Sequence, residues 1–415
     1  MCGRRVGTTY GRAMLLFSLP SSRPAVSVGM SAFLAGALAL TACTSTPTAP
    51  KVPKVVKTTV AVPSPTPTAV AKPQPFTAKR VPAALAAVIK PLYYGGRVRS
   101  SPSAAKVLVK RKPVKATRAV VVTGAVARWK GVPIAVVTSG KDVTLAVAAP
   151  KWKVVGGWWP SIGVSAPSLG GAARRVLVIG SDARPGQAID RARGDSLHIV
   201  GLDGHGGGGI LGIARDAYVP LATGGQGKIN SALTGGPEAL QRTVVSAAGV
   251  PLEGYLITGF LGFKQLVDGI GGLPLNAPVA VKDTKSSANV KAGANKLSGV
   301  QALSYGRARY AVPGGDFGRS ANQGLLIMAG AGFAKLAGPA RLPGLLAMAA
   351  PKIGTNMSAE QVLTFAAGVY IIHPNKVRNR VAAGGIGMTS GGESIVLLDA
   401  KARRLFADIR NGNLS

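Results

Sequence analysis

Residues 175–184 read RVLVIGSDAR, and this stretch decides how the second half of the chain folds. The apolar run 175–180 is long enough for a buried strand and ends in a glycine followed by polar residues. Two more apolar segments, 195–200 and 210–214, follow it. Together the three segments predict neighbouring strands of one sheet with polar residues at the strand ends.

Helical patterns follow these strands. Five segments have the length and apolar spacing of helices, namely 237–248, 260–269, 298–309, 319–336 and 359–370. Strands followed by interleaved helices predict an α/β or α+β sandwich, in which helices flank a central mixed sheet. Such sheets bind their ligands in loops at the strand ends, so the polar groups found there are the candidate site.

The first residues of the chain have the features of a targeting segment. Arginines precede an apolar stretch that ends in Leu-Thr-Ala-Cys at 40–43, which resembles the bacterial lipobox. We therefore expect residues 1–43 to be a lipoprotein signal, cut before Cys43, which then carries the lipid. An ordinary N-terminal signal anchor is the alternative. Both place the rest of the chain at the extracytoplasmic face of the cytoplasmic membrane.

Two regions are expected between the signal and the sandwich. Residues 44–105 are rich in proline and lysine, which predicts an extended linker. Residues 106–165 contain valine-rich runs separated by glycine turns, which predicts a small β-rich accessory region. Its adjacent Trp158 and Trp159 are expected to anchor it on its neighbour. Residues 170–415 then form the sandwich domain, with core motifs in 174–338.

The charge of the chain is strongly one-signed. Its 415 residues include 50 Lys and Arg but 15 Asp and Glu, a formal charge of +35, and the first acid is Asp142. This excludes an acidic solvating protein and favours a negatively charged partner. The two cysteines are Cys2 and Cys43, and there are three histidines. A multi-disulfide scaffold and a cysteine- or histidine-rich zinc site are therefore excluded.

The scarce acids recur beside arginines at the predicted strand and helix ends. The candidate site residues are Asp182, Arg193, Asp195, Arg215, Asp216, Lys228, Arg307, Arg309, Asp316, Arg319 and Gln323. Guanidinium groups brought together repel one another unless a polyanion or carboxylates lie between them. Magnesium bridges a couple of carboxylates to phosphates, so Asp182 and Asp195 beside the arginines predict a pyrophosphate site. A surface network of salt bridges, such as Arg215 with Asp216, is the alternative.

These residues lie in motifs that resemble those of the LytR-CpsA-Psr phosphotransferases of Gram-positive and actinobacterial envelopes. The motifs occur in one continuous order between residues 174 and 336. They are GSDAR at 180–184, RGD at 193–195, IARD at 213–216, KIN at 228–230, GG at 235–236, ALSYGRAR at 302–309 and DFGRSANQ at 316–323. The family usually has a small hydroxyl or apolar residue where Gly194 stands and a proline where Ala214 stands.

The resemblance implies a reaction, its partners and its cofactor. A glycan on a polyprenyl-pyrophosphate carrier would be moved to a peptidoglycan hydroxyl, leaving polyprenyl phosphate, with Mg²⁺ held by Asp182 and Asp195. The residues expected to clamp or orient the phosphates are Arg193, Arg215, Arg307, Arg309, Arg319, Gln323 and Lys228. Arg307 and Arg309 are also assigned to catalysis. Either Asp216 or Asp316 accepts the hydroxyl proton, and the sequence does not choose between them.

The resemblance also implies an apolar pocket for the polyprenyl tail. Its candidates are Leu256, Ile257, Phe260, Phe263, Leu266, Val267, Leu325, Leu326 and Phe333. The rival function is that of a non-catalytic envelope lipoprotein, which binds polyprenyl phosphate or an anionic polymer. Nucleic acid is not expected as a partner, because the N-terminus is of the exported type and the basic tract is short of exposed aromatic platforms.

Overall fold

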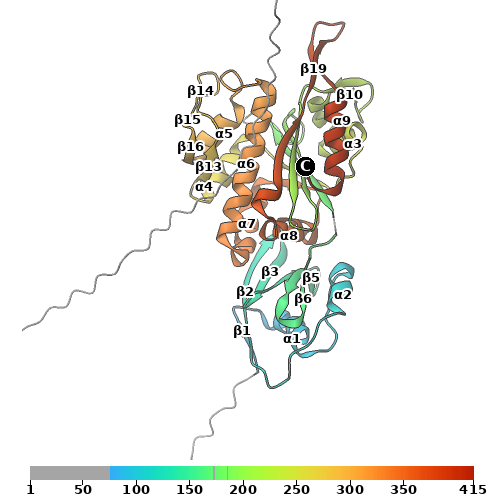
Figure 1. Cartoon of the computed structure of the whole chain (residues 1–415), viewed down its shortest axis with the longest axis vertical. Coiled ribbons are helices and arrows are strands. Elements are labelled where there is room, and N and C mark those ends of the chain that lie inside the picture. The colour runs from blue at the N-terminus through green and yellow to red at the C-terminus, as the bar shows by residue number, and fades with distance from the viewer. Residues whose placement is uncertain (1–74, 172, 185) are drawn as a thin grey trace, which may run out of the picture. The chain divides into compact units, whose positions relative to one another are not determined.

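The computed structural model describes residues 75–171, 173–184 and 186–415 (Figure 1). The predicted signal segment, Cys43 and residues 44–74 of the predicted linker lie outside the described residues.

A six-stranded sheet comes first along the described chain. Its strands, in spatial order, are β1 (Phe76–Lys79), β2 (Val120–Trp129), β3 (Val132–Ser139), β4 (Asp142–Ala148), β5 (Trp152–Trp159) and β6 (Val164–Ser168). β1 is parallel to β2, and the other neighbours are antiparallel. Every residue of β4 but the last is buried, because both faces of this sheet are covered.

Two helices cover the outer face of this sheet, and they correct the predicted linker boundary at residue 105. α1 (Ala83–Tyr94) lies, with β1, inside the segment that was predicted to be extended, and α2 (Pro102–Leu108) begins inside it. Leu85, Ile89 and Leu92 recur at helical spacing and are fully buried against the sheet. The prolines misled the prediction, since Pro102 occupies the first position of α2, where a helix tolerates it.

The inner face of the same sheet shares a core with the second half of the chain. Ile134, Val136 and Leu145 pack in one cluster with Leu342 of α7 (Leu342–Ala349) and Leu363 of α8 (Ala359–Ala367). Lys153 of β5 also pairs with Glu360 of α8, with 2.7 Å between Nζ and Oε2. The sheet is therefore fixed on α7 and α8 by a hydrophobic interface.

The two tryptophans differ in the anchoring role expected of them, because Trp159 packs in the core between the first sheet and α1 and α2, whereas Trp158 packs toward the neighbouring half of the chain. Trp159 is fully buried and donates its Nε1 hydrogen to Thr144 Oγ1 over 2.8 Å. Trp158 packs against the cluster that the sheet shares with α7 and α8. Neither ring is exposed for stacking on a sugar.

A second, mixed six-stranded sheet forms the centre of the sandwich. In spatial order its strands are β17 (Gly354–Thr355), β12 (Tyr255–Thr258), β7 (Arg174–Ser181), β8 (Gly194–Leu202), β9 (Gly208–Ile213) and β18 (Val377–Ala382). β12 is parallel to β7 and β18 is parallel to β9, while β8 runs antiparallel to both of its neighbours. The three strands predicted from the sequence are the middle of this sheet.

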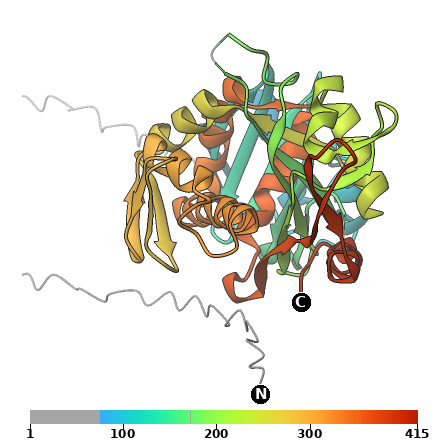
Figure 2. The same ribbon diagram turned by 90° about the horizontal axis from the view of Figure 1, so that it is seen from above.

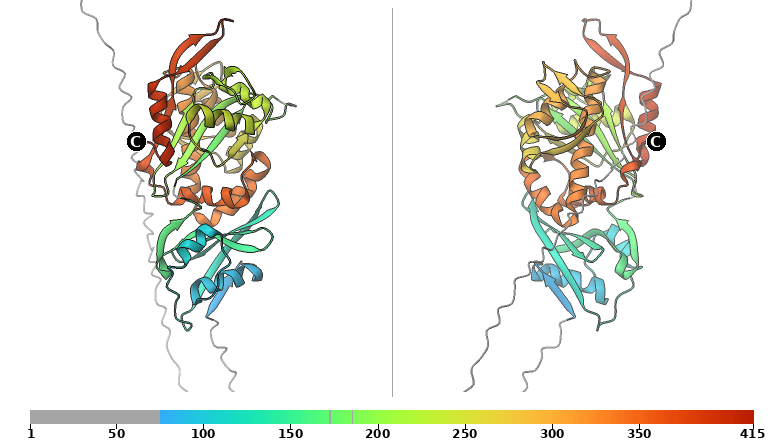
Figure 3. Two further views of the ribbon diagram at one scale, coloured as in Figure 1. Left: turned by 90° about the vertical axis from the view of Figure 1, so that its right-hand side faces the viewer. Right: turned by 60° about the vertical axis from the view of Figure 1, so that its left-hand side comes forward.

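Helices lie on both faces of the second sheet, as Figures 2 and 3 show. Leu177, Ile199 and Leu211 point to the face covered by α3 (Pro237–Ala248) and α9 (Ala400–Asp408). α6 (Asp316–Ala337) crosses the other face, where the Ser320 carbonyl meets His198 of β8. The predicted α+β sandwich with a central mixed sheet is confirmed.

The remaining elements complete the two layers. The other helices are α4 (Phe260–Gly269) and α5 (Gly299–Arg307), and short 3-10 segments include η2 (Ile229–Gly235) and η5 (Gly368–Tyr370). Four small hairpins pair β10 (Tyr218–Pro220) with β11 (Gln226–Lys228), β13 (Leu273–Ala277) with β16 (Gly293–Leu297), β14 (Val281–Asp283) with β15 (Ala288–Val290), and β19 (Gly384–Met388) with β20 (Ser394–Leu398).

Two predicted helix ends shift, and both shifts concern the candidate site. α5 begins after Ser298, whose side chain forms a capping box with Gln301, but the helix ends at Arg307, so Arg309 lies in the following loop. α6 begins at Asp316, earlier than predicted. Gly318 permits this, because a Cβ there would lie 2.1 Å from the Pro313 carbonyl oxygen of that loop.

No single helix among the described residues is both long and apolar enough to cross a membrane. The segments Asp316–Ala337 and Pro339–Lys352 meet the length and composition criteria only as a pair, and they are bent by 106°.

His198 makes the stability of this fold dependent on pH. Burial lowers its pKa to about 4, and its Nε2 lies 3.0 Å from the Ser320 carbonyl oxygen, to which the neutral ring donates. The unfolded chain protonates this ring near pH 6.5, so we expect the free energy of unfolding to fall by up to about 3 kcal/mol between pH 6.5 and 4. Urea unfolding across this range should show a shallower pH dependence for His198→Gln, and equal slopes for both proteins would contradict the assignment.

Candidate active site

The candidate residues from the strands meet at one edge of the second sheet. Asp182 follows β7, Arg193 directly precedes β8, and Arg215 follows β9. Because β8 is antiparallel to β7 and β9, the end of β7, the start of β8 and the end of β9 lie side by side. The sequence pattern of polar residues at strand ends therefore produces a single cluster.

α5 and α6 bring the second half of the cluster to the same edge. Arg307 is the last residue of α5, Arg309 lies in the loop after it, and Asp316 opens α6. Arg319 and Gln323 are one turn apart on α6, so they share a face of that helix. Gln323 donates its Nε2 hydrogen to the Gly306 carbonyl oxygen over 2.9 Å, which holds the end of α5 against α6.

Asp316 lies at the centre of the ion pairs. Its Oδ2 is 2.9 Å from Arg319 Nη2 and 3.6 Å from Arg215 Nε, and its Oδ1 is 3.9 Å from Arg309 Nη1. Asp195 accepts a hydrogen bond from Nη1 of Arg215. One carboxylate thus contacts three guanidinium groups, which reduces their mutual repulsion.

The remaining candidates pair more loosely. Arg193 Nε lies 3.8 Å from Asp182 Oδ2, while its backbone N–H donates to Asp182 Oδ1 over 3.0 Å. Asp216 Oδ2 is 3.5 Å from Arg215 Nε, and Asp216 Oδ1 is 3.7 Å from Lys228 Nζ. Both distances exceed ordinary hydrogen-bond lengths, so neither cation holds the Asp216 carboxylate closely.

The surface salt-bridge alternative does not describe this cluster. The pairs Arg215–Asp216 and Arg319–Asp316 exist, but the Arg319 side chain is 9% exposed and that of Arg215 is 19% exposed. Burial lowers the pKa of Arg319, while Asp195, Asp316 and Asp216 outweigh burial and raise the pKa of Arg215. Within the described chain the Nε atoms of both arginines are buried without a hydrogen-bond partner. Such donors favour an anionic ligand.

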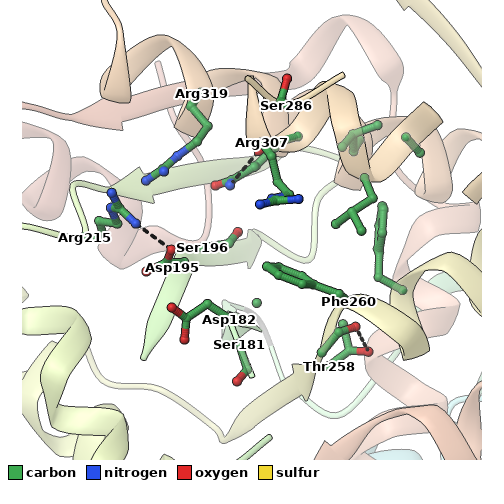
Figure 4. Close-up of a pocket in the computed structure, with 18 of the residues that line it drawn as sticks. Ser181, Asp182, Asp195, Ser196, Arg215, Thr258, Phe260, Ser286, Arg307 and Arg319 are labelled. Carbon is green, nitrogen blue, oxygen red and sulfur yellow. Dashed lines mark hydrogen bonds and ion pairs between the residues drawn. The ribbon is translucent and has the colours of Figure 1, made fainter. Parts of the chain in front are cut away.

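Arg307 connects the charged cluster to an apolar surface. Its guanidinium carbon lies 5.0 Å from the centre of the Phe260 ring, a cation–π contact, and no carboxylate among the described residues pairs with it. Figure 4 shows Arg307 and Phe260 directed into one cavity, with Arg215 and Arg319 on its other side. An anion held by Arg307 would therefore place its attached group on Phe260.

Two cavities meet at the arginines. The first, of about 470 Å³, is lined by the candidates Asp182, Arg193, Asp195, Arg215, Arg307, Arg309, Arg319 and Gln323. The second, of about 490 Å³, is lined by the candidates Arg193, Arg215, Asp216, Lys228, Arg309 and Asp316, and also by Ile386 and Val396 of the hairpin β19–β20. The structure thus separates Asp216, Lys228 and Asp316 from the first cavity.

The apolar residues predicted for the tail pocket divide between the first cavity and other parts of the fold. Phe260, Phe263 and Leu326 line the first cavity, as predicted for the tail pocket. Ile257 and Val267 are instead buried in two separate cores. Leu325 packs on the core of Val267, and Leu256 packs on the cluster that the first sheet shares with α7 and α8. Leu266 and Phe333 do not line this cavity. The sequence missed lining residues such as Val178, Leu303 and Ile327, because strand and helix spacing does not distinguish a pocket wall from a core.

Asp283 is a functional candidate that the sequence analysis missed. It is 2% exposed and accepts hydrogen bonds of 2.9 Å from both backbone N–H groups of Arg309 and Tyr310. Those donors, with the N–H groups of Ser286 and Lys285, outweigh burial and lower its pKa. The turn after Asp283 is visible in the sequence, but its contact with a loop 26 residues away is not.

The two departures from the family pattern are accommodated by packing. Gly194 is buried, and a Cβ there would lie 3.0 Å from Leu197 Cδ2 and 3.2 Å from Leu240 Cδ2. Ala214 is 4% exposed and belongs to the core of the second sheet. The glycine at 194 and the alanine at 214 therefore both occupy positions where the surrounding side chains leave little space.

A mixed sheet between helices, with an arginine-lined cavity that continues onto apolar side chains, defines an α+β sandwich protein whose candidate site joins a charged wall to an apolar one. The LytR_cpsA_psr family model matches residues 165–404, more than half of the chain, and the chain belongs to this family. The resemblance seen in the motifs is thereby confirmed.

Curated relatives match part of the chain. The Corynebacterium glutamicum protein named "Probable cell wall biosynthesis protein LcpB" is 32% identical over 165 residues, which is 37% of this chain and 40% of the relative. The Bacillus cereus "Polyisoprenyl-teichoic acid--peptidoglycan teichoic acid transferase TagU" is 33% identical over 157 residues, 37% of this chain and 50% of the relative. The chain spans half the length of these relatives or less.

Solved structures share the fold. The crystal structure of Bacillus subtilis TagV is 26% identical with a TM-score of 0.50, and the match covers 58% of this chain and 97% of that one. Protein gbs0355 from Streptococcus agalactiae is 21% identical with a TM-score of 0.50, covering 59% and 89%.

Removal of the Asp283 carboxylate should loosen Arg309. We expect Asp283→Ala to lower the affinity for inorganic pyrophosphate about tenfold, because two hydrogen bonds to an ionised group are lost. Asp203→Ala is the matched control, since Asp203 also accepts backbone N–H groups in a turn, those of His205 and Gly207. Isothermal titration calorimetry of both variants checks this. Equal affinity of the parent and Asp283→Ala would contradict the positioning role.

Proposed function

We propose that this protein transfers a glycopolymer from a polyprenyl-pyrophosphate carrier to peptidoglycan at the extracytoplasmic face of the cytoplasmic membrane. The observation that supports this most is the junction at Arg307 and Phe260, where a cationic cluster meets an apolar wall within one cavity. A pyrophosphate ester of a long apolar alcohol has the same two halves. Names of family relatives, such as the teichoic acid transferase TagU, are consistent with the substrate class.

The arginines would neutralise the charge that moves during the reaction. In the proposed complex Arg215, Arg307 and Arg319 hold the pyrophosphate from three sides, and Arg309 is kept near it by Asp283 and Asp316. Phosphoryl transfer requires little covalent help from the protein, so positioning and neutralisation carry most of the catalysis. Gln323 would act by fixing the end of α5 that carries Arg307.

The acceptor would approach from the second cavity. Its hydroxyl oxygen attacks the phosphorus that bears the glycan, and the bond from this phosphorus to the bridging oxygen breaks. Polyprenyl phosphate leaves, and the glycan becomes attached through a phosphodiester. We assign the hydroxyl proton to Asp216, because Asp316 is bound to Arg319 at 2.9 Å whereas both neighbours of Asp216 lie beyond 3.4 Å. Lys228 would then orient Asp216.

Magnesium fits the carboxylates of the first cavity. Asp195 Oδ1 is buried without a hydrogen-bond partner in the described chain, and Asp182 comes from the adjacent strand end. Among the described residues no group of three or more acids, histidines or cysteines is arranged to hold a metal. Two carboxylates suffice for Mg²⁺ when phosphate oxygens complete its shell, and the ion would supply charge neutralisation.

Two variants test the roles assigned to Arg309 and Asp216, and a third variant is the control. We expect Arg309→Ala to lower release of polyprenyl phosphate from a polyprenyl-pyrophosphate saccharide at least a hundredfold. Asp216→Asn should lower turnover similarly but leave donor affinity unchanged, since Asp216 lies outside the donor cavity. Replacement of Arg404, an exposed arginine on α9, by alanine is the control.

Tight donor binding with no release by the parent chain would instead support the rival function, that of a non-catalytic polyprenyl-phosphate binding lipoprotein.

The magnesium assignment has its own test. Asp182→Asn keeps the shape of the side chain and its hydrogen bond to the Arg193 N–H, but removes the charge. We expect about tenfold weaker binding of Mn²⁺, measured by electron paramagnetic resonance in the presence of pyrophosphate. Unchanged Mn²⁺ affinity in both Asp182→Asn and Asp195→Asn would contradict the site.

A further inference from the structure

A dense group of positive charges lies far from the candidate active site in the sequence. Between residues 90 and 118 the chain has nine basic residues, and no acid occurs anywhere from residue 75 to residue 141. We call these nine residues the outer cationic layer: Lys90, Arg97, Arg99, Lys106, Lys110, Arg111, Lys112, Lys115 and Arg118. They come from α1, α2 and the loops after them.

Hydrogen bonds tie these segments together. Arg111 donates from Nη2 to the Gly96 carbonyl oxygen over 2.6 Å, and the Val114 N–H donates to the Tyr93 carbonyl oxygen over 2.8 Å. The Lys112 N–H donates to the Ile162 carbonyl oxygen over 2.7 Å. The loop after α2 is therefore held against the end of α1, and its charges belong to one ordered surface.

No carboxylate of the described chain neutralises the charges of this layer. Every member except Arg111 is exposed, and none forms a salt bridge with a described acid. Asp142, the one acid of the first sheet, is buried and accepts a hydrogen bond from the Ser161 N–H. A surface of one sign costs self-repulsion that an external polyanion relieves.

The layer is held firmly on the part of the chain that contains the arginine cluster. α1 and α2 pack on the outer face of the first sheet, and the inner face of that sheet shares its core with α7 and α8. Figure 3 shows these two helices on the side of the sheet away from α7 and α8. A ligand on the layer would therefore be held at a fixed distance from the site.

The side chains indicate which polyanion fits. Between residues 75 and 169 no aromatic side chain is exposed, and Val109 is the one large apolar side chain exposed within the layer. Surfaces that insert into a bilayer interface place Trp, Phe or Leu beside their cations, and sugar rings are usually bound by aromatic faces. Scattered lysines and arginines without either feature suit repeated phosphates on a flexible chain.

We propose that the outer cationic layer binds a phosphate-bearing glycan polymer, the distal part of the chain that the active site transfers. The role of that polymer as a substrate rests on the proposed function. Its binding to the outer cationic layer is a separate claim that does not depend on that function. The contacts would be ionic, so the affinity for the polymer should fall as the salt concentration rises. By analogy with nucleic-acid binding, log K should fall against log salt concentration with a slope of about 0.7–0.9 for each phosphate that is neutralised.

Binding is tested with the full chain and a poly(glycerol phosphate) of defined length. The variant Lys106→Gln, Lys110→Gln, Lys115→Gln removes three exposed charges whose side chains make no hydrogen bond to described residues. Its matched control, Lys282→Gln, Lys291→Gln, Lys296→Gln, removes three exposed lysines from the hairpins β13–β16 and β14–β15 and their connections. We expect at least tenfold weaker binding and a salt slope reduced by about two in the first variant alone.

Two results would overturn the proposal. One is equal loss in the two variants, which would mean that only net charge matters. The other is unchanged polymer binding combined with lost binding to phosphatidylglycerol vesicles, which would assign the layer to the membrane surface.

A kinetic experiment separates this proposal from the proposed function. The layer variant should raise KM at least fivefold for a long anionic donor and leave turnover of an uncharged disaccharide donor unchanged. Equal KM values for the long donor would contradict the proposal. If no donor is turned over but polymer binding still depends on the three lysines, the proposed function fails and the layer assignment stands.

Discussion

The contact of Asp316 with three arginines is the interaction on which the rest of the site depends. Arg215 comes from the end of β9, Arg309 from the loop after α5, and Arg319 from α6. Without a shared carboxylate these guanidinium groups would repel one another and separate the sheet from the helices at this edge. With it, the cluster stays assembled, while the buried Nε atoms of Arg215 and Arg319 make no hydrogen bond to described residues, which favours the binding of an anion.

This constraint explains why two cavities meet there. The sheet edge and α6 form one wall of each, and the arginines form the wall that they share. A phosphorus atom held at that shared wall would face an apolar carrier on the Phe260 side and an acceptor on the Asp216 side. In the proposed function, the donor and the acceptor would therefore occupy different cavities and meet only at the shared arginines.

The sequence predicted the parts of this arrangement that depend on local pattern. The sequence analysis found three strands, at 175–180, 195–200 and 210–214, and the ordered motifs beside them. It could do so because the same local pattern, an apolar run with polar residues at its end, repeats along the chain. Two features could not be predicted from local pattern. The helices α1 and α2 were hidden by their prolines, of which Pro102 opens α2 while Pro91 lies inside α1, and Asp283 acts through a contact with Arg309 that no local spacing encodes. Pocket walls and cores also share one apolar pattern, so Ile257 was placed in the pocket although it is buried in the core.

The most direct measurement is a crystal structure of the full chain with a polyprenyl pyrophosphate of short chain length and Mg²⁺. The account predicts phosphate oxygens within hydrogen-bond distance of Arg215, Arg307 and Arg319, and the first isoprene unit against Phe260. A lipid bound with its pyrophosphate away from these arginines, or with its tail in the second cavity, would contradict it.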